Sequence, residues 1–276
     1  MPDTTATSVR RELASRGVSE AQMTTRENIN SLIKLRGAKA NPANFRSGQI
    51  DVMVHGTYAR GSDWTQPSGD FARRIASGRR TLTTRFEWSG GATENDRRTA
   101  GTQLSRFLND AGGAKLYRGM GAATSNPNSV RRDFGLNVVA HSHGGNVLGH
   151  AMENTRAFVR SAFLLGTPAM SRHPNPNVSW STNALRRVGN VFNIYSNRDR
   201  VQQELAQYNE GNNVVVGRQL NFPNIPQNRR NYQNIRFNPM NPQHDIDPYQ
   251  YQGVTVHSEL HNQATGRLIN DLIRQN

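Results

Sequence analysis

The sequence predicts an α/β fold with a mainly parallel central sheet flanked by helices. Short apolar runs recur along the chain, and such runs are typical of parallel strands that are buried on both faces. Segments with helical spacing separate them, which is the alternation expected of βα units. The length of 276 residues and the even spread of apolar segments indicate one main domain.

The expected elements follow one another in a simple order. Residues 1–47 are polar, with helical spacing from Ile29 to Leu35, and are predicted to form a partly helical N-terminal extension to a main domain at 48–276. Predicted strands cover residues 50–54, 84–88, 136–140, 161–166, 191–195, 214–216 and 254–256. Predicted helices cover residues 95–110, the segment after 142, and 259–273. Residues 169–187 are a candidate lid, and the Asn-, Gln- and Pro-rich range 202–250 is predicted to be an irregular insertion.

A sharp corner is predicted at Ser142, where the apolar run 136–140 meets an apolar helix. The small residues Ala140, Gly144 and Gly145 surround this serine, and a tight strand-to-helix turn requires small neighbours. The pattern differs from Gly-x-Ser-x-Gly because Ala140 occupies the first position. A corner of this kind, a nucleophile elbow, raises a serine hydroxyl above the carboxyl edge of the sheet. Ser142 is therefore the predicted nucleophile.

A nucleophilic serine needs a histidine to take its proton and a carboxylate to orient that histidine. In this topology the chain order is Ser, then Asp or Glu, then His. Asp199 follows the predicted strand 191–195 and is the expected acid. His257, at a strand-to-helix junction, and His261, about one turn further on, are both candidates for the base. We prefer His257.

Acyl transfer also requires donors for the developing oxyanion, usually backbone N–H groups beside the serine and on the first strand-to-helix loop. His143 is predicted to supply the first. Thr57 or Tyr58 would supply the second, and Gly56 would let that loop approach the site closely.

His141 and His143 flank the serine and raise a metal site as a rival interpretation, since two histidines in this spacing can bind a metal. Gly144, Gly145 and Asn146 follow instead of further ligands. We therefore predict no metal and no organic cofactor, with His141 a packed neighbour and His143 a wall of the site.

The composition limits the partners and the compartment. The net charge is +14, and only Lys34, Lys39 and Lys115 are lysines among the 34 basic residues. This arginine excess indicates either an attraction to anionic surfaces or merely a basic surface; without a dense basic run, nucleic acid is not expected as a partner. The chain has no cysteine, which excludes disulfides and a cysteine nucleophile. Without a signal peptide or an apolar membrane span, we expect a soluble protein, cytoplasmic or exported by a signal-independent route.

With these residues assembled, the chain resembles the lipase and esterase branch of the α/β hydrolases. The matching segments, in family order, are Val54–Thr57, Phe86–Gly90, Ala140–Asn146, Leu165–Pro168, Asp199–Val201 and His257–Ser258. The set is similar to bacterial lipase and phospholipase effectors. The resemblance implies an α/β-hydrolase fold, a Ser142, Asp199 and His257 triad, and ester hydrolysis through an acyl-enzyme.

We accordingly predict a lipase or phospholipase, with Thr57 and His143 as the oxyanion hole and with Tyr58 and Thr167 contacting the substrate. The expected partners are a lipid or ester substrate and an anionic membrane surface, and an immunity or secretion partner is left open. Two alternatives stay open: a non-catalytic binder of nucleic acid or anionic polymer on a hydrolase scaffold, and an esterase for small esters.

Overall fold

The computed structural model describes residues 15, 19–39, 49–112, 135–170, 180–197, 199, 201, 215–217, 219–220, 231–236, 257 and 259–276. The strands are β1 (Gln49–Val54), β2 (Thr81–Phe86), β3 (Gly135–His141), β4 (Val159–Leu165), β5 (Ala169–Met170), β6 (Val188–Tyr195), β7 (Val215–Gly217) and β8 (Asn231–Arg236). The helices are α2 (Glu20–Lys39), α3 (Asp70–Ala76), α4 (Glu94–Gly112), α6 (His143–Asn154), α7 (Thr182–Leu185) and α9 (Gln263–Gln275). Two single 3-10 turns, η2 (Asp63–Thr65) and η7 (Glu259–His261), accompany them.

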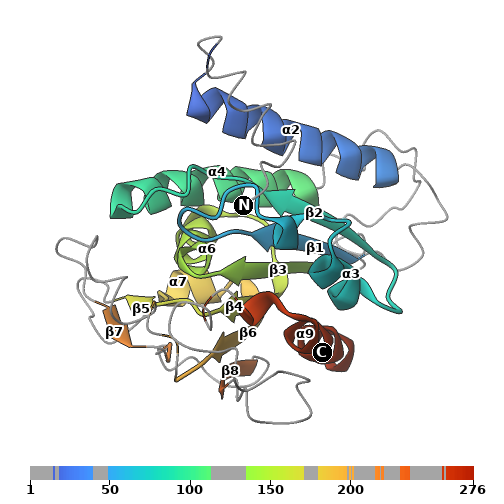
Figure 1. The fold of residues 1–276 in the computed structure, drawn as a ribbon, viewed down its shortest axis with the longest axis vertical. Helices are drawn as coiled ribbons and strands as arrows, with labels where there is room; N and C mark the ends of the chain where they lie inside the picture. The colour runs from blue at the N-terminus through green and yellow to red at the C-terminus, as the bar shows by residue number, and fades with distance from the viewer. Residues whose placement is uncertain are drawn as a thin grey trace.

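Six strands form one sheet in the order β2-β1-β3-β4-β6-β8 (Figure 1). Every neighbouring pair in this sheet is parallel. β5 and β7 form a separate antiparallel pair. The predicted α/β fold with a mainly parallel sheet flanked by helices is confirmed.

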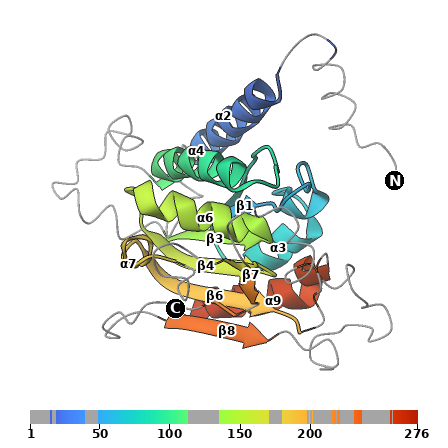
Figure 2. The ribbon, with the colours of Figure 1, turned by 90° about the vertical axis from the view of Figure 1, so that its left-hand side faces the viewer.

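Each face of the sheet carries its own core. Ile50, Val52 and Val54 of β1 point to one face, where they pack with residues of α4 and α6. Met53 points to the other face and packs with residues of α3 and α9. This alternation follows from the period of two in a strand. Figures 1 and 2 show the sheet between these two helical layers.

The register brings the carboxyl ends of the central strands to one edge. Val54 of β1 lies opposite Ala140 of β3, and His141 of β3 lies opposite Leu165 of β4. The residues that follow these strands therefore leave the sheet side by side. Side chains from distant parts of the sequence can meet at this edge, which is where sites form in parallel sheets.

Helix α2 lies against β2 and α4, so the described part of the N-terminal extension packs on the main domain (Figure 1). Met23 and Leu35 are buried there, whereas Ile29 and Ile33 are 49% and 55% exposed. None of the helices in the described part of the chain has the length and apolarity needed to cross a bilayer.

The structure differs from the sequence prediction in several elements. β2 covers Thr81–Phe86 rather than 84–88, because the backbone of Glu87 bonds to a side chain of α2 instead of continuing the ladder. Within the range 202–250, for which short strands were predicted, β8 is an edge strand of the main sheet, which the sequence did not indicate. Helix α3 was not predicted.

Several predictions lie partly or wholly outside the described residues, including most of the insertion 202–250 and the parts of the extension 1–47 other than residues 15 and 19–39. The described ends of the candidate lid 169–187 are β5 and α7, and Trp180 and Leu185 are buried in the core. Residues 171–179, between them, lie outside the description, as does the predicted strand 254–256.

Candidate active site

Ser142 lies at the corner between β3 and α6, with φ 54° and ψ −134°. Among the described residues, Ser142 and Tyr58 are the two non-glycine residues with positive φ, and both lie at this edge of the sheet. Such a backbone costs about 1–3 kcal/mol and persists where its surroundings impose it. The Ser142 N–H donates to the Leu165 carbonyl at 2.8 Å, and its own carbonyl accepts from the Gly145 N–H at 3.0 Å. The chain thus holds a strained serine at the end of a central strand.

Glycines make room around the corner. A Cβ on Gly56 would lie 2.7 Å from Ser142 Cβ, and one on Gly144 would lie 2.5 Å from the His55 carbonyl oxygen. Both distances are shorter than real Cβ contacts allow. The close approach that the sequence predicts for Gly56 is confirmed.

His257 and Asp199 are in contact. The Nδ1–H of His257 donates to Asp199 Oδ2 at 2.7 Å, and the carboxylate is fully buried while the histidine is 7% exposed. Because a carboxylate only accepts, Nδ1 carries a proton, and Nε2 is the ring nitrogen left to exchange a proton with a substrate or a serine. Gly166, at φ 57°, makes room for the pair, because a Cβ there would lie 3.1 Å from both partner atoms.

His141, the residue before Ser142, fixes the backbone of His257. Its Nε2–H donates to the His257 carbonyl at 2.8 Å, and the two ring centroids are 4.5 Å apart. In the described structure the Ser142 hydroxyl makes no hydrogen bond with the His257 ring. Catalytic hydrogen bonds in unliganded sites often close only with substrate.

The second candidate base, His261, lies in a different position. Its ring stacks on Trp64 with centroids 5.0 Å apart and planes 5° apart, and it meets His141 edge to face. Burial, together with the nearby His257, lowers its pKa to about 4. Of the two candidates, His257 is the one from which Asp199 accepts.

The histidines that flank Ser142 have separate partners. Burial, with the nearby Arg97 and His257 adding to it, lowers the pKa of His143 to about 3, and burial lowers the pKa of His141 well below its usual value. His143 Nδ1 accepts from Asn146 Nδ2 at 3.2 Å, whereas His141 bonds to His257. Across the described residues, no three His, Asp or Glu side chains are placed to hold a metal ion.

The predicted oxyanion donors lie on the loop after β1 and at the start of α6. His143 opens helix α6, so its N–H belongs to the first turn, where N–H groups point out of the helix end. Of the two loop candidates, the Tyr58 N–H already donates to the Gly90 carbonyl at 3.0 Å. The loop donor suggested by this geometry is therefore Thr57, which follows Gly56.

The two predicted substrate contacts differ in exposure. The Tyr58 side chain is 80% exposed beside the loop. Thr167 is fully buried and packs against Gly145, because a Cβ on Gly145 would lie 2.1 Å from the Thr167 hydroxyl oxygen. A substrate contact of Thr167 remains a prediction from the sequence. Trp64, which stacks on His261, was missed, because nothing in the local pattern around it marks a site residue.

Comparisons with known proteins give weak structural similarities, and two of these are described here. No protein-family model matches the chain, and no curated protein matches its sequence. A lipase-esterase related protein from Clostridium acetobutylicum ATCC 824 is similar in structure at 9% identity and a TM-score of 0.41, over 83% of this chain and 95% of that one. An uncharacterized protein from Pseudomonas aeruginosa is similar at 11% identity and a TM-score of 0.30, over 79% of this chain and 44% of that one. With TM-scores below 0.5, neither neighbour bears on the function.

Proposed function

We propose that the chain is a serine hydrolase of the α/β-hydrolase type that cleaves carboxylic esters. The observation that carries this proposal is the strained Ser142, at φ 54°, on the edge of the sheet where Asp199 and His257 are in contact at 2.7 Å. Backbone strain of this kind clusters at functional sites.

The first half of the proposed reaction forms an acyl-enzyme. His257 Nε2 takes the Ser142 proton as the serine oxygen bonds to the acyl carbon of the ester. The carbonyl oxygen becomes an oxyanion, which accepts from the backbone N–H groups of Thr57 and His143. The oxyanion then re-forms the carbonyl, the bond to the alcohol breaks, and His257 returns the proton to the leaving oxygen.

The second half repeats these steps with water. His257 takes a proton from water, whose oxygen bonds to the acyl carbon, and Ser142 leaves with the proton returned by His257. Asp199 stays ionised throughout, where it orients the ring and stabilises the imidazolium that forms twice. No other reactant is needed.

Within the ester hydrolases we propose a lipid substrate, as a lipase or phospholipase. Tyr58 supports this choice, because an 80% exposed aromatic side chain on the proposed oxyanion loop suits contact with an interface. The net charge of +14 would favour anionic vesicles, by about 1 kcal/mol for each basic residue near the surface. Turnover on vesicles should rise with anionic lipid and fall with salt, whereas an esterase for small esters would prefer dissolved substrate.

The reaction is tested by a fluorophosphonate probe, which modifies activated serines. Wild type should be labelled once, and Ser142→Ala should be neither labelled nor active on p-nitrophenyl butyrate. The matched control is Ser68→Ala, because Ser68 is an exposed serine. If the Ser142→Ala chain is labelled, or if wild type is not labelled, the enzyme proposal is wrong and a binding protein is favoured.

A further inference from the structure

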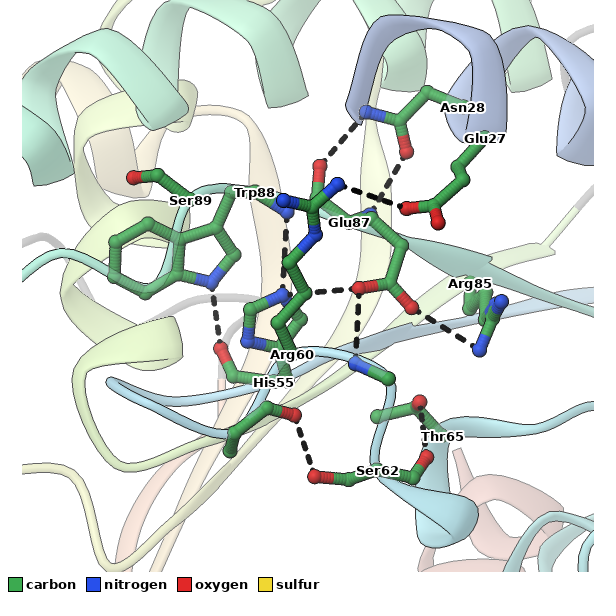
Figure 3. Close-up of polar contacts among 12 residues, drawn as sticks. Glu27, Asn28, His55, Arg60, Ser62, Thr65, Arg85, Glu87, Trp88 and Ser89 are labelled. Atoms are coloured by element: carbon green, nitrogen blue, oxygen red, sulfur yellow. Dashed lines mark hydrogen bonds and ion pairs between the residues drawn. The ribbon is translucent and has the colours of Figure 1, made fainter. Parts of the chain in front are cut away.

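A buried charged group lies beside the proposed oxyanion loop, residues 55–61, and the proposed mechanism does not use it. Glu87 is fully buried, and its carboxylate lies 3.1 Å from Arg85 Nη1 and 3.3 Å from His55 Nε2 (Figure 3). It begins the strap, residues 87–90, which follows β2. The strap runs along the loop rather than along the sheet.

The strap holds the oxyanion loop at three points. Trp88 donates from its backbone N–H to His55 Nε2 at 3.2 Å and from its indole Nε1–H to the His55 carbonyl at 2.8 Å. The Gly61 N–H donates to Glu87 Oε2 at 3.3 Å. Between them, Gly90 accepts from the Tyr58 N–H at 3.0 Å. Gly56 and Thr57 lie within the part of the loop that these bonds enclose.

Helix α2 holds the strap in turn. Asn28 Nδ2 donates to the Glu87 carbonyl at 2.7 Å, and Asn28 Oδ1 accepts from the Glu87 N–H at 2.8 Å (Figure 3). β2 is an edge strand of the main sheet, so the Asn28 amide bonds the backbone where an outer strand would otherwise lie. A second tie joins α2 to the loop directly, between Glu27 Oε2 and Arg60 Nη2 at 3.3 Å.

We propose that Asn28 is a positioning residue for the oxyanion hole, which acts from helix α2 through the strap on Gly56 and Thr57. This inference rests on the proposed ester hydrolysis. Its physical basis is that oxyanion donors work only when they are fixed where the charge develops. The N-terminal extension, which resembles nothing in the hydrolase pattern, thereby becomes part of the catalytic apparatus.

The test is Asn28→Ala in the full chain, with two substrates that differ in one atom. The first is an activated ester, and the second is the matching thionoester, whose sulfur accepts hydrogen bonds weakly and so gains little from an oxyanion hole. Asn30→Ala is the matched control, because Asn30 is an exposed asparagine on the same helix. Rates are divided by the number of sites titrated with a fluorophosphonate, so that unfolded chains do not count.

For Asn28→Ala we expect kcat on the ester to fall about tenfold, less than the 10²–10³ that follows complete loss of a donor. KM should stay within about twofold and the thionoester rate should hardly change, so the ester-to-thionoester ratio falls about tenfold as well. Asn30→Ala should match wild type. An equal loss on both substrates, or no loss, overturns the positioning role.

Asn28→Asp covers the case in which Asn28→Ala does not fold. It keeps the acceptor for the Glu87 N–H and loses the donor to the Glu87 carbonyl, so the ratio should fall in the same direction. An unchanged ratio in a folded Asn28→Asp chain also overturns the inference. If wild type turns over no ester and is not labelled by the probe, the proposed function itself fails. If wild type is active but Asn28→Ala leaves the ester-to-thionoester ratio unchanged, only the positioning role of Asn28 fails.

Discussion

Gly56→Ala tests the contact between the oxyanion loop and the proposed nucleophile. The added Cβ would lie 2.7 Å from Ser142 Cβ and 3.0 Å from the His141 carbonyl oxygen. Non-bonded carbons prefer about 3.5–4.0 Å, so the loop or the corner has to move by about 1 Å. Neither neighbouring atom can move away as the end of a flexible side chain, because the His141 oxygen belongs to the backbone and Ser142 Cβ is bonded to it.

A displacement of about 1 Å at a catalytic group can cost about 10²-fold in rate, or about 2.7 kcal/mol of activation free energy. We expect kcat of Gly56→Ala on p-nitrophenyl butyrate to fall by this factor. Overpacking costs about 1–3 kcal/mol of folding free energy, less than the 5–15 kcal/mol typical of a domain. The variant should therefore fold, as circular dichroism and a thermal melt will show.

Gly37→Ala is the control for this experiment. Nothing lies within 4 Å of a Cβ at Gly37, which is part of helix α2. Alanine should leave kcat unchanged and stabilise the helix by up to about 1 kcal/mol. A Gly56→Ala chain that keeps kcat within about twofold of wild type refutes the reasoning, because the loop would then not constrain Ser142.

Three further substitutions test the base, the acid stability and the core. His257→Phe should abolish ester turnover, whereas His261→Phe should retain it within a few-fold, because a phenyl ring can still stack on Trp64; the reverse ranking would make His261 the base. His261 has its pKa lowered from 6.5 to about 4, so the unfolded chain binds more protons between these values and stability is lost as pH falls through that window. Urea unfolding should therefore show that the free energy of unfolding falls between pH 7 and pH 5, and that this fall is about 1–2 kcal/mol smaller in His261→Phe than in wild type. An equal fall in both proteins would contradict the assignment of this effect to His261. Asp51→Ala should cost about 3–5 kcal/mol in urea unfolding without changing kcat, because it leaves Arg79, 6% exposed, buried without its carboxylate; an unchanged unfolding midpoint would count against that ion pair.

The central strands and the corner were predictable because their signals are local. β1 and β3 are buried on both faces, so they appear in the sequence as mostly apolar segments, interrupted by Asp51 and Asn137. The corner at Ser142 needs small residues within a few positions of the serine, and these are read directly from the chain. The approach of Gly56 was predictable for the same reason.

The elements that escaped prediction depend on contacts from far along the sequence. β8 has the polar sequence Asn-Tyr-Gln-Asn-Ile-Arg, in which Tyr232 packs on one core and Ile235 on the other. One apolar side chain on each face is enough to pack an edge strand against both cores. Such a strand contains no run of apolar residues that a sequence analysis could detect. Asn234 adds bonds to Asn193 and Leu220, which no local pattern indicates.

The bond between Asn28 and Glu87 joins residues that are 59 positions apart. An asparagine on a polar helix is normally a solvent-exposed residue, so its type gives no sign of a partner. The same holds for Trp64, whose ring is one of several apolar groups until the fold places His261 on it.

The neutral histidines around His257 have a consequence for the proposed reaction. When His257 takes the serine proton it becomes a cation, and a charged neighbour at ring contact would oppose that step. Burial keeps His141, His143 and His261 neutral at pH 7, because it lowers the pKa of each. The imidazolium then has Asp199 as its nearest charged partner through a 2.7 Å bond. The burial that lowers these three pKa values thus spares the imidazolium a like charge from these three histidines each time it forms.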